Sequence, residues 1–114
     1  MKIVYVSSPF QGKEENLEKA RRYCRLVVSK GYLPLAPHIY FSQFMDDKNP
    51  EDRKLAMKMN KKLVEFADEM WVFGSKITEG MKEEIEYFMK VKGKDKINWI
   101  SGEDIERMLT LDSR

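Results

Sequence analysis

The chain has 114 residues, of which 42% are hydrophobic and 35% are charged, and its formal net charge is +2. These values are typical of a globular protein and exclude a disordered chain. The length supports one hydrophobic core and is too short for two, so we expect a single domain over residues 1–114. Lysines and glutamates are interspersed along the chain, which excludes the basic stripe of a nucleic-acid-binding protein.

Composition also argues against metal, membrane and export functions. The single cysteine, Cys24, permits neither an internal disulfide nor a multi-cysteine metal site, and we expect no metal and no cofactor. No apolar run approaches the roughly 20 residues that cross a bilayer. The first strand begins at the N-terminus without the apolar region of a signal peptide. We therefore expect a cytoplasmic protein whose partners include neither membranes nor nucleic-acid polymers.

The first part of the chain predicts two strands and a long helix. Residues 2–6 form a β-branched and aromatic run typical of a buried strand, and residues 7–12 form a loop of small, turn-forming residues. A helix follows from about 14 to 30, and Gly31 ends it. Residues 32–37 form a short second strand, whose two prolines place it at the edge of the sheet.

The rest of the chain alternates helix and strand. Residues 38–44 are a short apolar turn or helix. After a polar loop, a helix starts at Asn49-Pro50, with proline at its first position, and runs to about residue 67. Its predicted inward residues are Leu55, Met59, Leu63 and Phe66. The remaining elements are a strand over 69–73, a helix over 78–89, a strand over 96–100 and a last helix capped by Ser101 and Asp104. The tryptophans of the last two strands, Trp71 and Trp99, are predicted to be core residues.

Strands that alternate with helices predict an α/β fold: a parallel sheet of about four strands with helices on both faces, in a flavodoxin-like or Rossmann-like three-layer domain. Right-handed crossovers favour the strand order 2-1-3-4. In such a sheet, ligands bind outside the strand ends between strands 1 and 3, where the chain reverses direction. The loops 7–12 and 74–80 flank that crevice. The topology therefore gathers six residues around one cavity: Tyr5, Ser7, Ser8, Thr78, Gly80 and Glu84.

Glu84 lies where a solvent-facing helix residue should not. At about 100° per residue, Met81, Ile85 and Phe88 share one apolar side of the helix, and Glu84 falls on that side. A carboxylate there is either costly or functional. Beside a tyrosine at the floor of a cavity, it suits a nucleophile aimed at a sugar carbon, because a nearby negative charge stabilises an oxocarbenium-like transition state. The alternative is a surface glutamate on a lysine-rich helix.

The two loops also favour an anion. Their hydroxyl groups, and the helix N-termini that follow them, suit a phosphate. The sequence contains neither a Walker A motif nor Gly-x-Gly-x-x-Gly, so the indication is weak. By the alternative interpretation, Ser7 and Ser8 simply end a strand and Thr78 is only a helix N-cap.

Four segments carry a resemblance to a known family: residues 5–9, 34–38, 67–74 and 79–85. With them, the chain resembles the nucleoside 2-deoxyribosyltransferase-like superfamily. Within it, the chain is most similar to small bacterial and phage proteins of the DUF4406 and DUF7768 type. The resemblance extends from Tyr5 to about Ile100. It implies the same flavodoxin-like sheet, a small-molecule nucleoside or nucleotide as partner, and a homodimer or higher homo-oligomer.

The resemblance also implies roles for individual residues. Glu84 occupies the position of the superfamily's nucleophilic glutamate, four residues after the loop glycine, here Gly80. Tyr5 matches a strand-one tyrosine that orients the nucleophile, and Thr78 stands where relatives contact phosphate or the sugar 5′ end. The candidate catalytic residues are Glu84, Tyr5 and Asn60. The candidate substrate-binding residues are Ser7, Ser8, Gln11, Gly12, His38, Thr78, Gly80 and Met81.

Two positions depart from the catalytic relatives. Asn60 stands where they usually carry a second carboxylate, and an amide can hydrogen-bond a ribose hydroxyl or a base but cannot transfer a proton. Gln11 replaces an arginine of nucleotide-hydrolysing relatives, which weakens a phosphate clamp. His38 is the only histidine and cannot form a metal site alone. It contacts a ligand, acts as a general acid or bonds a loop carbonyl.

Three functions remain open from the sequence. The first is an N-glycosidase or deoxyribosyltransferase that acts on a nucleoside or nucleoside 5′-monophosphate through Glu84. The second is a non-catalytic nucleotide-binding module, favoured by Asn60 and Gln11. The third is a protein-interaction domain with a vestigial pocket. It would use the apolar residues of segment 39–44, which form a dimer surface or cover the cavity: Ile39, Tyr40, Phe41 and Phe44.

Overall fold

The computed structural model of the protein describes residues 1–112. Its elements follow in the order β1 (Ile3–Ser7), α1 (Glu14–Ser29), β2 (Leu33–Leu35), α2 (Pro37–Phe41), α3 (Pro50–Val64), β3 (Glu69–Phe73), α4 (Glu79–Lys92), η1 (Lys94–Lys96), β4 (Ile97–Ile100) and α5 (Gly102–Asp112). The alternation of strands and helices is the predicted one. Segment 38–44 is helical only in its first part, and the helix after Asn49 ends three residues earlier than expected.

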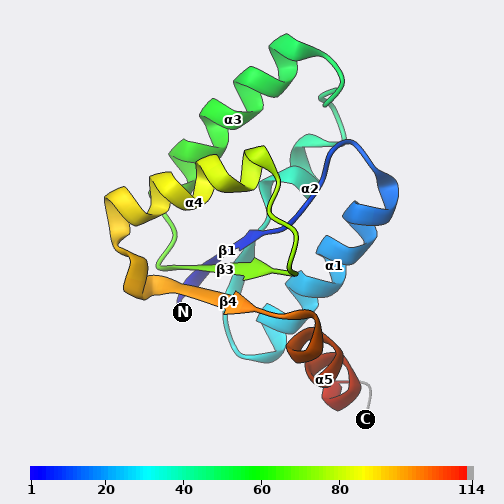
Figure 1. Ribbon diagram of the computed structural model, residues 1–114, viewed down its shortest axis with the longest axis vertical. Helices are drawn as coiled ribbons and strands as arrows, with labels where there is room; N and C mark the ends of the chain where they lie inside the picture. Colours follow the sequence, from blue (N-terminus) through cyan, green and yellow to red (C-terminus); the bar gives the residue numbers. More distant parts are fainter. Residues whose placement is uncertain (113–114) are drawn as a thin grey trace.

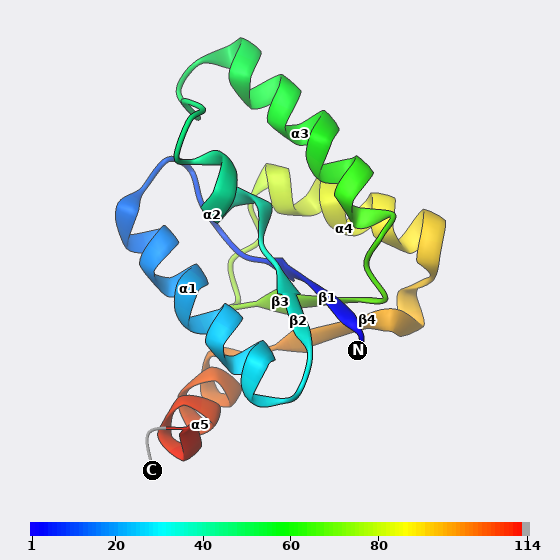
Figure 2. The ribbon, with the colours of Figure 1, turned by 180° about the vertical axis from the view of Figure 1, so that it is seen from behind.

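The sheet has four parallel strands in the predicted order, β2-β1-β3-β4. Its centre is formed by β1 and β3, which pair directly, with Tyr5 opposite Met70. The proline-containing β2 pairs only with β1 and lies at an edge, as predicted. Two helices, α3 and α4, cover one face of the sheet, and α1 and α5 lie on the other (Figures 1 and 2). This is a Rossmann-like α/β arrangement.

Alternation along the strands decides which helices each residue meets. Odd-numbered Tyr5 of β1 and even-numbered Met70 and Val72 of β3 share the face covered by α3 and α4. Their buried partners from the helices and the following turn are Val64, Ala67, Met81, Ile85 and Phe88. Residues of opposite parity pack on the α1 and α5 face; they include Val4, Val6, Trp71, Phe73, Leu26, Val27 and Ile105. Tyr5 is therefore directed towards α4.

Side-chain caps fix where the functional helices begin. Asn49 accepts hydrogen bonds from the backbone N–H groups of Glu51 and Asp52, with Pro50 in the first turn of α3. The Thr78 hydroxyl accepts the N–H of Met81 at 3.2 Å and caps α4. Each cap costs about 1 kcal/mol when it is removed. Both helices therefore start at defined points, and both of these starts border the cavity described below.

Three residues predicted to be core are exposed instead. Leu55 and Phe66 are 49% and 62% exposed, and Trp99 is 57% exposed. Helix α3 lies above the sheet and its N-terminal end reaches beyond it (Figure 1); Leu55 belongs to the first half of this helix. Phe66 falls in the turn after α3, which ends at Val64. Trp99 lies on β4, the strand at the edge of the sheet, and no element within residues 1–112 covers its side chain there.

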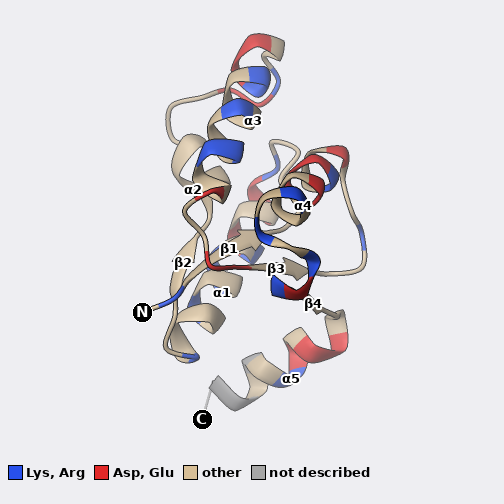
Figure 3. Ribbon diagram, turned by 90° about the vertical axis from the view of Figure 1, so that its left-hand side faces the viewer, with Lys and Arg blue, Asp and Glu red and all other residues tan. Residues whose placement is uncertain are grey.

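Charges of both signs are interspersed along α3 and α4, as Figure 3 shows. The first turn of α3 is acidic and its last turn is basic, an arrangement that complements the helix dipole.

Within residues 1–112, no helix is long and apolar enough to cross a membrane.

Candidate functional site

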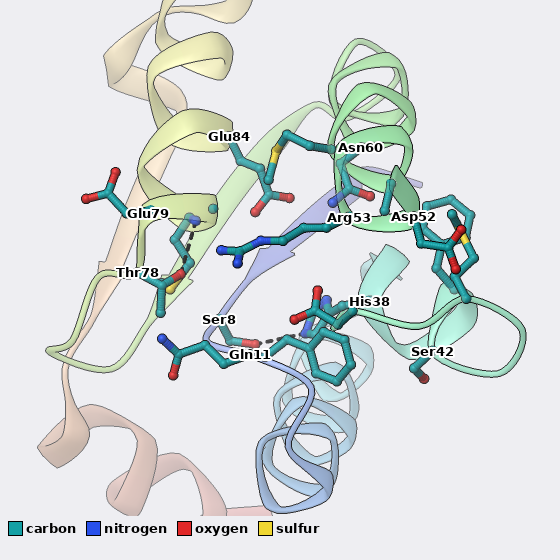
Figure 4. Close-up of a pocket in the computed structure, with 18 of the residues that line it drawn as sticks. Ser8, Gln11, His38, Ser42, Asp52, Arg53, Asn60, Thr78, Glu79 and Glu84 are labelled. Carbon is teal, nitrogen blue, oxygen red and sulfur yellow. Dashed lines mark hydrogen bonds between the residues drawn. The ribbon is translucent and has the colours of Figure 1, made fainter. Parts of the chain in front are cut away.

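A cavity of about 170 Å³ lies at the carboxyl ends of β1 and β3, where the topology predicts a ligand site. The loop after β1, helix α2, helix α3 and the start of α4 enclose it (Figure 4). Most of the residues predicted from the sequence line this cavity: Ser8, Gln11, His38, Asn60, Thr78, Gly80, Met81 and Glu84. Tyr5, Ser7 and Gly12 are not among the residues that line it.

Glu84 lies on the floor of the cavity, and its carboxyl group is paired with Tyr5, which lies beneath it. Helix α4 carries Glu84 one turn beyond its start, on the side that faces the sheet. The Tyr5 side chain, 1% exposed, rises from β1 and its hydroxyl donates a hydrogen bond to Glu84 Oε2. Strand parity and helix periodicity together thus place a phenol and a carboxylate side by side from positions 79 residues apart.

Burial raises the pKa of Glu84 from 4.5 to about 7. The hydrogen bond from Tyr5 opposes this rise, and the negative charge of Glu83 makes a smaller contribution to it. Burial also raises the pKa of Tyr5 well above its usual value, and the neighbouring Glu84 adds to this effect. The proton therefore stays on Tyr5, and Glu84 is the group that ionises near neutral pH.

His38 lies on the opposite wall, at the start of α2. Its Nε2 is 3.1 Å from Ser8 Oγ, and its ring packs against Phe10 with ring centroids 6.2 Å apart. Burial lowers the pKa of His38 to about 4. The imidazole is therefore neutral at pH 7 and serves as a hydrogen-bonding group, which argues against the general-acid role considered from the sequence.

Two buried polar atoms have no hydrogen-bond partner within residues 1–112: Asn60 Oδ1 and Ser7 Oγ. Asn60 points into the cavity from α3 (Figure 4). A buried acceptor without a donor costs about 1–3 kcal/mol. Ser7 is 1% exposed and lies beneath the loop. Asn60 is thus the one of the two that a ligand in the cavity could satisfy.

The start of α4 forms one wall of the cavity through Thr78, Gly80 and Met81. A Cβ on Gly80 would lie 3.2 Å from Met57 Cε of α3, closer than most real contacts. The glycine therefore allows α3 and α4 to approach each other at the cavity wall. Met81 is 1% exposed and holds this end of α4 against the core, so its main contribution is to packing.

The loop after β1 turns sharply beside the cavity. Gln11 and Gly12 have positive φ angles of 51° and 69°, a conformation that suits glycine and is uncommon for glutamine. Gln11 reaches the cavity, whereas Gly12 lies behind it, where its missing Cβ would face Asp47 Cβ at 3.6 Å. Gly12 therefore shapes the loop without touching the cavity.

Phe41, predicted as part of a segment that forms a dimer surface or covers the cavity, does line it. The sequence analysis did not name five polar residues on the same side of the cavity: Arg53, Asp46, Asp47, Asp52 and Ser42. The cap at Asn49-Pro50 could have indicated them. A helix that follows a strand of a parallel sheet begins at the carboxyl edge of the sheet, so its first turns lie beside the ligand crevice. Figure 4 shows the Arg53 side chain extending from α3 across the cavity towards α4.

The predicted interaction residues divide between two environments. Tyr40 and Phe44 are 63% and 61% exposed, whereas Phe41 lines the cavity. The three rings pack on one another, with centroids 5.1 to 6.0 Å apart. The aromatic segment thus covers one side of the cavity and leaves two rings at the surface.

Comparisons with known proteins agree with this fold. Residues 2–97 match the family described as a domain of unknown function, DUF7768, and the chain belongs to that family. A likeness to DUF4406 proteins stays a prediction. Comparison with curated proteins gave no match.

Two solved structures share the fold. A 2-deoxyribosyltransferase from Bacillus psychrosaccharolyticus is similar with a TM-score of 0.66 and 19% identity, over 87% of this chain and 72% of that one. The CMP N-glycosidase BcmB of Clostridium botulinum is similar with a TM-score of 0.52 and 14% identity, over 99% of this chain and all (100%) of the other. At these identities, the likeness concerns the fold.

Proposed function

We propose that this member of the DUF7768 family is an N-glycosidase or deoxyribosyltransferase that acts on a nucleoside or nucleoside 5′-monophosphate, with Glu84 as its nucleophile. The observation that carries the proposal is the position of Glu84. Its carboxyl group faces a cavity at the switch point of the sheet, is held by the Tyr5 hydroxyl and has a pKa of about 7. A carboxylate that ionises at neutral pH and is oriented by a buried donor suits attack on a sugar carbon.

The reaction follows from this geometry in two steps. Ionised Glu84 attacks C1′ of the sugar and forms an ester bond, while the bond between C1′ and the base breaks and the base leaves with the electron pair. The base takes a proton from water. A water molecule or a second base then attacks C1′, loses a proton to solvent and releases Glu84 as a carboxylate. Tyr5 keeps the attacking oxygen in place throughout.

The comparisons add support of a general kind. A 2-deoxyribosyltransferase and a CMP N-glycosidase are among the structures that share the fold, so this arrangement of strands and helices is compatible with such chemistry. Fold alone does not assign a function. The proposal therefore rests on the cavity and on Glu84.

Base release from a panel of substrates tests the proposal. The purified protein is incubated with nucleosides and nucleoside 5′-monophosphates, and free base is measured by chromatography. Glu84→Gln keeps the shape of the side chain but removes the nucleophile, and we expect it to lower the rate by roughly a thousandfold or more. Glu86→Gln, an exposed position on the same helix, is the matched control. Absence of release, or release that Glu84→Gln leaves unchanged, would refute the proposal.

A second candidate is a nucleotide-binding module without turnover. Asn60 favours it, because its amide cannot transfer a proton. Gln11 favours it too, because this amide stands where nucleotide-hydrolysing relatives have an arginine. This candidate predicts that a nucleotide raises the melting temperature of the protein while chromatography recovers the nucleotide intact. A panel that leaves the melting temperature unchanged at millimolar concentration would exclude it.

A further inference from the structure

We propose that Arg53 makes the site selective for phosphorylated substrates: its guanidinium group binds the 5′-phosphate of a nucleoside 5′-monophosphate while Glu84 faces C1′. This inference rests on the proposed function, because it names the substrate class of the same cavity. The sequence predicts a phosphate contact from the loops 7–12 and 74–80, with Gln11 at the first-loop position where nucleotide-hydrolysing relatives have an arginine. The structure supplies a cation from a different element.

The first step of the argument is the position of Arg53. Asn49 caps α3, and the Arg53 N–H donates to the Asn49 carbonyl at 2.9 Å, so the first turn of the helix is formed and fixes the arginine backbone. From there the side chain reaches across the cavity, towards the wall where Thr78 and Glu84 lie (Figure 4). An arginine on the outer face of α3 would not line the cavity.

The second step is that the guanidinium group is free. Within residues 1–112 it forms no ion pair and no hydrogen bond, although carboxylates line the same cavity. Two of those carboxylates are already engaged elsewhere. Asp52 Oδ2 accepts the Asp46 N–H at 2.9 Å, and Asp46 Oδ1 accepts the Lys48 N–H at 3.0 Å. The five donors of the arginine thus remain available for an oxyanion, which a guanidinium group binds in a bidentate manner.

The third step is the match between the cavity and a sugar phosphate. The wall opposite Arg53 carries the Thr78 hydroxyl and Gly80. Gly80 precedes Glu84 by four residues of α4, and four residues of a helix span about 6 Å along its axis. One ribose 5-phosphate unit spans such a distance, with its phosphate beside Arg53 and Thr78 and its C1′ beside Glu84. The unpartnered Asn60 Oδ1 also faces the cavity and needs a donor, which a ribose hydroxyl supplies.

The acidic residues make the role of Arg53 more specific. Asp46, Asp47 and Asp52 line the cavity on the α3 side and repel a dianionic phosphate. Glu79 also borders the cavity, and its carboxylate points away from the arginine (Figure 4). A phosphate can therefore bind only where the guanidinium group offsets this repulsion. Inorganic phosphate, which lacks the sugar and base contacts, should bind much more weakly than a nucleotide.

Matched pairs of ligands test this selectivity. Binding of each nucleoside and its 5′-monophosphate, and of inorganic phosphate, is measured by calorimetry with the wild-type protein, Arg53→Gln, Arg53→Lys and the control Lys54→Gln. We expect the wild type to bind monophosphates about ten- to a hundredfold more tightly than the matching nucleosides. Arg53→Gln should lose this preference with nucleoside binding unchanged, Arg53→Lys should keep part of it, and Lys54→Gln should keep all of it. Circular dichroism verifies that each variant is folded.

The outcomes separate this inference from the proposed function. A monophosphate preference that depends on Arg53, without any base release, would support the inference and refute the proposed function. Base release from nucleosides and monophosphates with equal KM values, unchanged in Arg53→Gln, would overturn the inference and leave the proposed function intact. Binding of inorganic phosphate as tight as that of the nucleotides would overturn it too. If no ligand of the panel binds, both proposals fail.

Discussion

The floor of the cavity and its rim use ionisable groups in opposite ways. On the floor, burial raises the pKa of Glu84 to about 7, and on the nearby wall burial lowers the pKa of His38 to about 4, so both groups resist ionisation. On the rim, which comprises Arg53, Asp46, Asp47 and Asp52, the guanidinium group of Arg53 is exposed. Desolvation therefore controls the chemistry of the floor, whereas solvated charges control access at the rim. The predictions below test whether the two regions are separable.

The largest expected effect concerns the stability of the floor. The folded-state pKa of Glu84, about 7, exceeds its ordinary value of 4.5. The folded protein thus holds a proton that the unfolded chain releases, and stability falls as pH rises from 4.5 to 7. Glu84→Gln removes this loss. We expect it to raise the free energy of unfolding by at most about 3 kcal/mol above pH 7, with no gain below pH 4.5.

Urea denaturation between pH 4 and pH 9 measures this difference, with Glu86→Gln as the control. His38 supplies an internal contrast of opposite sign. Its folded-state pKa is lowered from 6.5 to about 4, so its penalty appears as pH falls through that window. A constant stability difference between Glu84→Gln and the wild type across the whole range would show that Glu84 is not desolvated on the floor.

The next effect concerns how Tyr5 positions and tunes Glu84. Only ionised Glu84 can attack, so kcat/KM for base release should rise with pH, with a midpoint near 7. The Tyr5 hydrogen bond lowers the pKa of Glu84. Tyr5→Phe should therefore move the midpoint upward by roughly one pH unit, the equivalent of one hydrogen bond to a charged group.

Tyr87→Phe is the matched control for Tyr5→Phe. Tyr87 lies on α4, as Glu84 does, but its hydroxyl donates a hydrogen bond to Glu65 at 2.7 Å and not to Glu84. Its pH profile should equal that of the wild type. A Tyr5→Phe variant with a lower rate but an unchanged midpoint would contradict the proposed electrostatic role and leave only a packing role for the tyrosine.

The contrast between floor and rim also explains what the sequence could predict. Tyr5 and Glu84 were both identified because strand alternation and helix periodicity are strict, and because the strand order follows from right-handed crossovers. These rules fix which side chains face each other across the sheet. Burial of Val4, Val6 and Phe88 follows from the same rules. The floor is thus a direct consequence of regular secondary structure.

The rim depends on features that periodicity does not determine. Arg53 lies in the first turn of α3, and its direction depends on how that helix is tilted against α4, including the close approach allowed by Gly80. Leu55, which periodicity predicted to be buried, is exposed in the same part of α3. Trp99 was misassigned for a related reason, because the pattern of β4 does not reveal that a sheet edge is left uncovered. The sequence pattern therefore does not predict how the helices pack against one another, or which parts of the sheet and helices stay uncovered.

A smaller effect is expected at Asn60, which lies between floor and rim. Its buried Oδ1 has no partner within residues 1–112, so Asn60→Leu removes an unsatisfied acceptor and keeps a similar volume. We expect the free energy of unfolding to rise by about 1 kcal/mol without ligand, and nucleotide binding to weaken by about tenfold. Urea denaturation and calorimetry measure the two quantities. Loss of stability in Asn60→Leu would show that the amide is satisfied in the free protein.

The smallest effect is the response of the rim to salt. Between 0.05 and 0.5 M sodium chloride, we expect the affinity for a nucleoside 5′-monophosphate to fall by about three- to tenfold, because the exposed guanidinium group of Arg53 is screened. In Arg53→Gln the affinity should depend little on salt. The pH midpoint of base release should stay nearly constant over the same range, since burial, the largest cause of the raised pKa of Glu84, is not screened by salt. A midpoint that moved together with the affinity would show that rim and floor form one electrostatic unit, and Arg53 would then act on the nucleophile as well as on the substrate.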